Sequence, residues 1–523
     1  MIEWPPRAPR PGREVACFGY AAKGDELLAP DAETNRNPAL AALATEAYDA
    51  GTLAQLALAR DGGFGGWIAS ERELAVFLDP FGLQEMWVYR GPAGLAIAED
   101  IGALETAYAG RLTPDVEQLR RFARAGKFYG DGTAYREIRR LWGGCVYYFD
   151  AESRERVEPY VRYADLAARR VRSQSELTEE VTERLLRIVA RSAPSALERL
   201  IIPLSGGLDS RLLAAAVAAQ GLDAEAVTFG DAGSPDVKLA SRVAPILGLP
   251  LRHYPVDYPS WPQHGAEAIE RTRGQVSVQV LSPPAELVSA LRAGSTPLLS
   301  GAAGNTTMGG IELDQVRASG PYGTAALSEL ASGDYGPPAG LLEGLAHQAF
   351  CRDVLRILLH VRRGVTASMR DIGAGRYRLP FLALSLLRDL WAAGPEYRAS
   401  RGLQVETFRA IAPARLLDVP LTGRRAYPHR EEHLIVRGLR SLRYRGMKAV
   451  GRDLAPGFID HARILRVHGD KFGAAIRSSA LLREAGVALA PRPEPRDIFR
   501  AFTLASYYEH RLRPRDHGAP RSA

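Results

Sequence analysis

The residues whose types and spacing best suit chemistry form one short stretch, Leu204-Ser205-Gly206-Gly207-Leu208-Asp209-Ser210. Glycines have no Cβ atom, so the backbone can turn tightly and approach a ligand closely. Successive N–H groups in such a turn form a concave anion site, and a following helix adds its positive N-terminal end. Asp209 is a carboxylate in this anion-attracting loop, as expected if a divalent cation binds together with phosphates. The stretch predicts a site for ATP and Mg²⁺, with Asp209 as metal ligand and catalytic residue.

The segments on either side of this loop indicate how it is positioned. Residues 201–204 are apolar and predict a buried strand, and residues 211–220 predict a helix that stops at Gly221. The loop differs from the phosphate loop in which a lysine follows the glycines. An ordinary strand–turn–helix corner, in which the serines and Asp209 have no special role, is the alternative interpretation.

The elements that follow alternate between strand and helix. A strand, a helix and a second strand are predicted at 224–229, 236–247 and 251–256. This β-α-β-α-β order predicts a parallel sheet with right-handed crossovers, in which ligands bind at the carboxyl ends of the strands. Thr228, Phe229 and Gly230 lie at such an end, and we expect them to contact the adenine and ribose of ATP.

The first part of the chain has a different pattern. Short strands separated by turns are predicted at 15–20, 64–69, 74–79, 86–89, 94–99 and 145–149, with a helix at 119–125. We expect a mostly antiparallel sheet domain of the α+β class. The charged residues 151–173 lack periodicity and predict a linker. A helix then begins at a capping box of Ser173 and Glu176, and residues 340–515 show mainly helical patterns.

Composition limits the classes of protein to consider. A chain of 523 residues is expected to form two domains, and 46% hydrophobic with 24% charged residues is typical of a soluble globular protein. Its apolar runs are shorter than the about 20 residues that span a membrane, so no membrane partner is expected. The N-terminus lacks a signal-peptide pattern. The three cysteines are far apart and indicate neither disulfides nor a zinc site, which favours a cytoplasmic location.

The chain is basic, with a net charge of +7 and a pI near 9.3. Only five of its 67 basic residues are lysines, and the arginines are scattered along the chain. A solvated surface explains this pattern, and attraction of an anionic ligand is the alternative. Basic residues are not interleaved with aromatic ones, so nucleic acid is not an expected partner.

Taken together, these motifs resemble the asparagine synthetase family. The Ser-Gly-Gly-x-Asp-Ser loop is similar to that of the N-type ATP pyrophosphatases, which cleave ATP to AMP and pyrophosphate. Ser300 and Gly301 stand where the family has its second pyrophosphate loop, which implies that they bind phosphate. Other similar motifs are Thr228-Phe229-Gly230, Asp236-Val237-Lys238-Leu239-Ala240 and Arg378-Leu379-Pro380-Phe381-Leu382.

The resemblance also implies a domain organisation. Asp79-Pro80-Phe81-Gly82 resembles a turn of class II glutamine amidotransferase domains. Residues 1–165 would be an amidotransferase-like α+β sheet domain. Residues 173–523 would be a synthetase domain with an α/β parallel sheet of the ATP-pyrophosphatase type and a helical C-terminal part. Glutamine-hydrolysing members use an N-terminal Cys as nucleophile. Position 2 is Ile here, so the first domain is expected to be inactive.

Three further positions bear on catalysis by comparison with the family. Cys17 would become N-terminal only if sixteen residues were removed, and a small buried strand residue is the preferred interpretation. The late catalytic lysine of many members aligns with Arg425, which keeps the positive charge but cannot transfer a proton as lysine does. Lys448 is the nearest lysine. Arg425 and Lys448 are therefore the candidate catalytic cations.

The metal site also departs from the family. Asn305 stands where the family has a metal-binding Asp, and Ala302 replaces a Glu. An amide oxygen can ligate a cation but adds no charge, so we expect Asp209 and Asn305 to hold Mg²⁺ more weakly than two carboxylates would. Asp236 or Asp314 would be the additional carboxylate if one is needed.

The resemblance implies an ATP-dependent ligase that adenylates a carboxylate and passes it to an amine, releasing AMP and pyrophosphate. Lasso-peptide macrolactam synthetases and β-lactam synthetases are members of this kind without the N-terminal Cys. The expected partners are a small-molecule or peptide carboxylate, an amine donor and a peptide-processing protein. Two alternatives stay open, namely an asparagine-synthetase-like amidotransferase that uses ammonia or another amine, and a non-catalytic relative that binds nucleotide or peptide. The sequence does not identify the acid, the amine or the oligomeric state.

Overall fold

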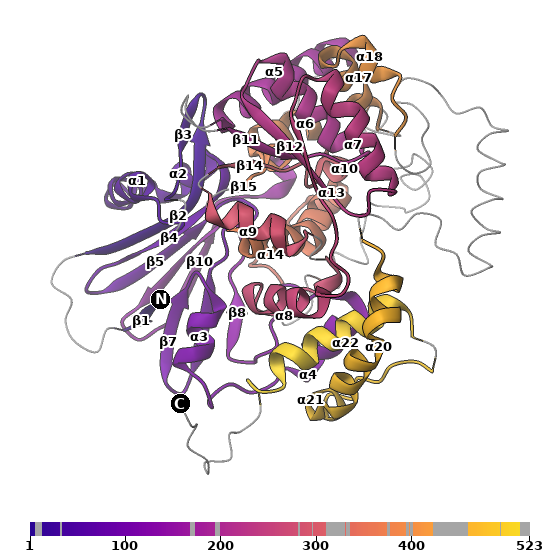
Figure 1. The fold of residues 1–523 in the computed structure, drawn as a ribbon. Helices are drawn as coiled ribbons and strands as arrows, with labels where there is room; N and C mark the ends of the chain where they lie inside the picture. Colours follow the sequence, from indigo (N-terminus) through magenta and orange to yellow (C-terminus); the bar gives the residue numbers. More distant parts are fainter. Residues whose placement is uncertain are drawn as a thin grey trace.

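The protein is described here by a computed structural model (Figure 1). It describes residues 1–512 except for the segments 6–12, 32–33, 168–172, 194–198, 281–282, 295, 310–329, 331–334, 374–376, 394–396, 398–400, 422–458 and 492. Two antiparallel sheets come first in the chain, and a parallel sheet surrounded by helices follows.

The larger antiparallel sheet has six strands. They are β2 (Glu14–Lys23), β3 (Glu26–Leu28), β4 (Asp61–Ala69), β5 (Glu73–Leu78), β9 (Cys145–Asp150) and β10 (Glu155–Pro159), in the order β10-β9-β5-β4-β2-β3. The smaller sheet consists of β1 (Ile2–Trp4), β6 (Trp87–Gly91), β7 (Gly94–Ala98) and β8 (Ile138–Arg140), in the order β1-β7-β6-β8. Each strand predicted in this part of the chain coincides with one of these strands.

The prediction of a linker at 151–173 is wrong in part. Strand β10 lies inside this stretch and pairs with β9, and the short helix η1 (Tyr163–Asp165) follows it. Strand β10 is at the edge of its sheet, and none of its residues is fully buried. An exposed edge strand needs no apolar face, so its sequence carries no alternation by which it could be recognised.

The two faces of the larger sheet pack into different cores, because successive side chains of a strand point to opposite sides. Cys17 and Phe64 belong to a core cluster that includes residues of α1 (Pro38–Asp49) and α2 (Leu53–Leu58). Their neighbours Phe18 and Trp67 belong instead to the largest core of the molecule, which continues into the second part of the chain. The two parts are therefore joined by a common apolar core.

The parallel sheet forms the centre of the second part. Its strands are β11 (Leu200–Pro203), β12 (Ala224–Phe229), β13 (Leu251–Tyr254), β14 (Leu298–Leu299) and β15 (Tyr377–Arg378), in the order β13-β12-β11-β14-β15. Strand β11 is in the middle, with β12 on one side and β14 on the other, and all pairings are parallel. The predicted α/β parallel sheet is confirmed.

The helices around this sheet agree with the predicted alternation. They include α5 (Gln174–Ser192), α6 (Leu208–Ala219) and α7 (Pro235–Ile246). Helix α5 begins at the predicted capping box of Ser173 and Glu176. Helix α6 begins earlier than predicted, so that Asp209 and Ser210 lie in its first turn rather than in the preceding loop.

The other helices belong to both parts of the chain. They are α3 (Ile101–Ala107), α4 (Val116–Ala125), α8 (Trp261–Arg271), η2 (Val278–Val280), α9 (Ala285–Ala293), α10 (Gly304–Thr307), η3 (Leu345–His347), α13 (Cys351–Arg356), η4 (Ile357–Val361), α14 (Arg362–Ile372), η6 (Pro380–Leu382), α15 (Leu384–Ala392), α17 (Gly402–Ile411), α18 (Ala414–Leu417), α20 (His461–Ser478), α21 (Ala480–Glu484) and α22 (Pro495–Tyr508). Across the described stretches, no helix combines the length and the apolar character that crossing a bilayer requires.

The last helix returns to the first part of the chain. Helix α22 packs against α4 (Figure 1), and the hydroxyl of Tyr507 donates a 2.6 Å hydrogen bond to Glu105 of α3. Tyr507 and Tyr508 share a core cluster with Trp87 and Tyr89 of β6. The first part thus contacts both the parallel-sheet part and the C-terminal helices, and the domain boundary proposed between residues 165 and 173 stays a prediction.

Candidate functional site

The predicted phosphate loop lies at the carboxyl end of the central strand β11. The loop at 300–305 follows β14 on one side, and residues 228–230 end β12 on the other. Three segments that were selected separately from the sequence therefore lie along one edge of the sheet, where parallel α/β folds bind their ligands.

The loop after β11 is shaped by its own serines. The backbone N–H of Ser205 donates to the Ser210 hydroxyl at 3.0 Å, and the N–H of Gly207 donates to the Ser205 hydroxyl at 3.1 Å. The two hydroxyl oxygens are 2.9 Å apart. Gly207 is the N-cap of α6 and supplies no side-chain hydrogen bond, so the first N–H groups of this helix remain available to an anion.

The second loop packs closely against the first. A Cβ atom on Gly301 would lie 3.3 Å from the backbone nitrogen of Ser210. A Cβ atom on Gly304 would lie 2.8 Å from Cγ of Asp209, closer than real Cβ atoms come. The Ser300 N–H donates to the carbonyl of Arg378 at 2.9 Å, which fixes the start of this loop against β15. Ser300, Gly301 and the 205–210 loop are therefore brought together as predicted.

Both oxygens of the Asp209 carboxylate accept hydrogen bonds from the protein. The backbone N–H of Asn305 donates to one at 2.8 Å, and Nε2 of Gln404 donates to the other at 2.6 Å. Burial raises the pKa of Asp209 above its ordinary value of 3.8, and the hydrogen bond from Gln404 opposes that rise. The carboxylate is held in one position at the contact between the two loops.

The donor atoms here fit a hard cation in part. The Oδ1 atom of Asn305 is buried and has no hydrogen-bond partner within the described residues, so it is available as an oxygen ligand beside Asp209. Asp236 also reaches this corner, where it accepts a 2.9 Å hydrogen bond from the N–H of Gly206. The part of the chain that the structure describes holds no cluster of three or more His, Cys, Asp or Glu suited to a metal. A cation bound here would therefore depend on substrate phosphates for further ligands.

The end of β12 is less open than predicted. Thr228 is 1% exposed, and its hydroxyl has no hydrogen-bond partner among the described residues. Gly230 has a φ of 120°, a conformation that side-chain-bearing residues rarely adopt. Its carbonyl oxygen is 2.8 Å from Nε2 of His253. Gly230 is also buried, and its N–H donates to the Tyr254 carbonyl at 3.1 Å, so that of these three residues only Phe229 is partly exposed.

The predicted catalytic cations Arg425 and Lys448 lie outside the described residues, as does Asp314. Gln404 was not predicted at all. It comes from α17, it is fully buried, and its Oε1 atom has no partner within the described part of the chain. No local pattern marks Gln404, because its contact with Asp209 joins positions 195 residues apart in sequence.

The expected inactivity of the first domain rests on Ile2 and Cys17, and both residues lie within strands of the structure. Ile2 is buried in β1, where it pairs with Ile97. Cys17 lies within β2 opposite Gly66 and is 2% exposed. Burial raises the pKa of the Cys17 thiol to about 12, so the thiol stays protonated near neutral pH. Exposing Cys17 as a new N-terminus would also remove β1 from its sheet, which supports the interpretation of a buried strand residue.

The parallel sheet and its loops are those of an α/β synthetase domain. The family model of asparagine synthase matches residues 180–418, which include β11 through α18. The match confirms, over these residues, the resemblance to the asparagine synthetase family that the motifs predict. The family implies an ATP-dependent synthetase. No curated protein sequence matches the chain.

Solved structures show only distant likeness. The allosteric regulatory enzyme of purine biosynthesis is 13% identical, with 30% of each chain covered and a TM-score of 0.15. Glutamine phosphoribosylpyrophosphate amidotransferase from B. subtilis, complexed with ADP and GMP, is 12% identical over 39% of this chain and 35% of its own, with a TM-score of 0.15. NMN synthetase from Francisella tularensis is 15% identical over 38% of this chain and 94% of its own, with a TM-score of 0.20. This chain spans about a third of the first two, and TM-scores this low carry no conclusion about function.

Proposed function

We propose that this protein is an ATP-dependent ligase that activates a carboxylate as an acyl-adenylate and joins it to an amine. The observation that carries the proposal is the contact between the 205–210 loop and the 300–305 loop at the N-terminus of α6. Two phosphate-binding loops that meet at an uncapped helix end suit a polyphosphate leaving group better than a single anion.

The first half-reaction follows from this placement. The substrate carboxylate attacks the α-phosphorus of ATP, and the bond from that phosphorus to the bridging oxygen of the β-phosphate breaks. The N–H groups of Leu208 and Asp209 at the start of α6 receive the charge of the departing pyrophosphate. Ser300 and Gly301 hold its other side. A dry, closed site is needed because water would hydrolyse the acyl-adenylate.

Mg²⁺ would bind to Asp209 and Asn305 Oδ1 and would supply positive charge to the phosphates. The hydrogen bonds from the Asn305 N–H and from Gln404 already hold the Asp209 side chain in one conformation, so cation binding requires no change of its rotamer. The same two donors compete with the cation for the carboxylate oxygens. We therefore expect weak binding of Mg²⁺ alone and tighter binding of Mg²⁺ together with ATP.

In the second half-reaction an amine attacks the acyl carbon, AMP leaves, and an amide forms. The buried Cys17, whose thiol has a raised pKa, argues against ammonia released from glutamine by the first domain. We therefore favour an amine carried by the substrate itself, as in lasso-peptide macrolactam or β-lactam formation. A peptide substrate would require a processing protein that exposes its amine. The alternative is an amidotransferase-like reaction, in which free ammonia or another external amine attacks the same acyl-adenylate.

A non-catalytic nucleotide-binding relative is a separate candidate. The observation that favours it is that both Asp209 oxygens already accept hydrogen bonds from the protein, and that the described residues form no cluster of three or more side chains suited to a metal. Exchange of labelled pyrophosphate into ATP, measured with a panel of amino acids and peptides, separates the two. Carboxylate-dependent exchange supports the ligase. Binding of ATP by calorimetry without exchange for any acid supports the non-catalytic relative, and absence of ATP binding contradicts both.

A further inference from the structure

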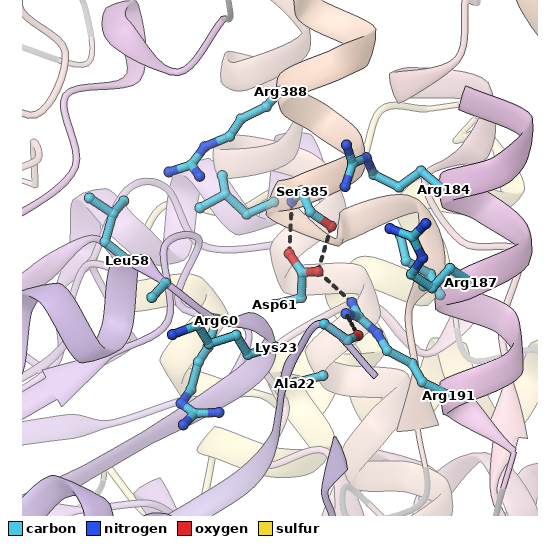
Figure 2. A pocket seen from close by; sticks show the side chains of 14 residues that line it. Ala22, Lys23, Leu58, Arg60, Asp61, Arg184, Arg187, Arg191, Ser385 and Arg388 are labelled. Atoms are coloured by element: carbon cyan, nitrogen blue, oxygen red, sulfur yellow. Dashed lines mark hydrogen bonds and ion pairs between the residues drawn. The ribbon is translucent and has the colours of Figure 1, made fainter. Parts of the chain in front are cut away.

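A second candidate site lies away from the two loops, where the first part of the chain meets helices α5 and α15. It is a pocket of about 100 Å³ (Figure 2). We propose that it binds a small phosphate-type anion and so links the first part of the chain to the synthetase domain. Six cationic side chains line it, namely Lys23, Arg60, Arg184, Arg187, Arg191 and Arg388.

The one carboxylate in the lining, Asp61, is already neutralised. It accepts hydrogen bonds from the backbone N–H of Ser385 at 2.7 Å and from the Ser385 hydroxyl at 2.5 Å. It also forms an ion pair with Arg191. Figure 2 shows Asp61 at the centre of the pocket, with these contacts on either side of its carboxylate. Asp61 therefore holds Ser385 and Arg191 in place, and the other cations have no acidic partner among the residues that line the pocket.

The remaining cations are only partly compensated. Arg187 and Arg60 pair with Glu183 and Glu26, whose carboxylates are 69% and 53% exposed, so solvent screens both pairs. Arg184 pairs with the buried Asp389.

Three side chains in the lining have unused binding capacity. The side chains of Lys23 and Arg388 form no ion pair or hydrogen bond with any other residue in the described part of the chain. The Arg60 side chain is 8% exposed, yet its Nε is buried without a hydrogen-bond partner among the described residues. An unpaired guanidinium N–H in a buried wall is costly unless an acceptor binds there.

The size and the donors of the pocket select the ligand. A volume of about 100 Å³ holds roughly three water molecules, which suits one tetrahedral oxyanion and not a nucleotide. Arginine presents a planar fork of donors that matches phosphate oxygens and remains charged at all physiological pH values. The pocket shares no residue with the loops at 205–210 and 300–305, so this proposal does not depend on the ligase proposal.

The pocket draws its residues from both parts of the chain. Lys23, Arg60 and Asp61 come from β2, α2–β4 and β4, whereas Arg187 and Arg388 come from α5 and α15. The N–H of Ser385 and the guanidinium of Arg191, which donates to the Gly24 carbonyl at 2.9 Å, already cross this boundary. A bound anion would add contacts across the same boundary and would stabilise the assembled form.

The test is calorimetric titration of the full chain with inorganic phosphate and, separately, with glycerol 3-phosphate, at constant ionic strength and with saturating ATP and Mg²⁺ to occupy the two loops. We expect saturable binding that the double variant Arg187→Gln, Arg388→Gln weakens about tenfold to a hundredfold. Binding of phosphate alone identifies the free ion as the ligand, and binding of both probes identifies an exposed phosphoryl group of a larger molecule.

The matched control removes the same charge elsewhere. Arg466 and Arg496 are exposed, lie on α20 and α22, and take no part in the pocket. The variant Arg466→Gln, Arg496→Gln should bind phosphate as the parent does. The proposal is overturned if neither probe binds saturably, if the pocket variant binds as tightly as the parent, or if both double variants lose binding equally. Failure of ATP to bind would contradict the ligase proposal. The phosphate affinities of the two double variants could still be compared with that of the parent.

Discussion

Replacing Asp209 by asparagine separates the role of its charge from its role in holding the two loops together. The carboxylate accepts one hydrogen bond from the Asn305 N–H and one from Gln404. In Asp209→Asn, the new Oδ1 can accept from Asn305. The new Nδ2 can donate to Gln404 Oε1 once the Gln404 amide turns over, because that oxygen has no partner among the described residues. The loop contact is therefore retained while the negative charge is lost.

The two consequences have opposite signs. Loss of one electrostatic stabiliser is expected to lower the rate of pyrophosphate exchange by about a hundredfold or more. The free energy of unfolding at neutral pH should stay within about 1 kcal/mol of the parent or rise, because hydrogen bonds are exchanged one for one and a buried charge is removed.

The effect on stability also depends on pH. Burial raises the pKa of Asp209 above its ordinary value of 3.8, so just above pH 3.8 the folded parent binds more protons at this site than the unfolded chain does. Its contribution to stability is therefore fully present at lower pH and is lost as pH rises through the folded-state pKa. The stability of the parent relative to Asp209→Asn should fall across this window.

The measurements are exchange of labelled pyrophosphate and denaturant unfolding at several pH values. Asp223→Asn is the matched control, because Asp223 is exposed and its carboxylate forms a surface ion pair with Arg199. That control should leave both exchange and the pH dependence near those of the parent. Full exchange activity in Asp209→Asn would refute the catalytic role of the Asp209 charge. Unfolding of this variant at neutral pH would refute the inference that the contact between the two loops is retained.

Three other outcomes are expected. Gly304→Ala should destabilise the protein by about 1–3 kcal/mol in denaturant unfolding, because its Cβ would lie 2.8 Å from Asp209, whereas Gly233→Ala, with no atom within 4 Å, should be neutral. Equal effects of the two changes would contradict the close packing of the loops. Gln404→Leu should raise the pKa of Asp209 further and move the acid limb of the exchange profile to higher pH, and an unmoved limb would exclude this coupling. Cys17 should resist alkylation by iodoacetamide in the folded protein, as judged by mass spectrometry, since its thiol is buried and its pKa is raised to about 12; rapid labelling would show that the thiol is accessible.

Local sequence predicted those features that local interactions determine. The capping box of Ser173 and Glu176 marks the start of α5, because both of its hydrogen bonds form within four residues. The order of β11, α6, β12, α7 and β13 follows from apolar periodicity and places the phosphate loop at the carboxyl end of the sheet. The start of α6 was misplaced because a glycine N-cap leaves no polar side chain to signal it.

Features that depend on long-range contacts were not predictable in this way. Gln404 lies within helix α17, and only its hydrogen bond to Asp209, a residue distant in sequence, connects it with the site. The edge strand β10 lacks the alternation of apolar and polar residues that a half-buried strand shows, and β1, with three residues, is too short for its alternation to be recognised. The arginines of the second pocket each resemble a surface residue in sequence, and only folding brings them together.

The shared cores have a consequence for any attempt to divide the molecule. Phe18 and Trp67 of the first sheet belong to the same core as Leu212 beside the central strand, and Tyr508 of the last helix belongs to the same core cluster as Tyr89 of β6. A chain cut between residues 165 and 173 would leave apolar faces on both fragments exposed to water. We therefore expect the synthetase part to need the N-terminal sheets in order to stay folded, whether or not these sheets carry any chemistry of their own.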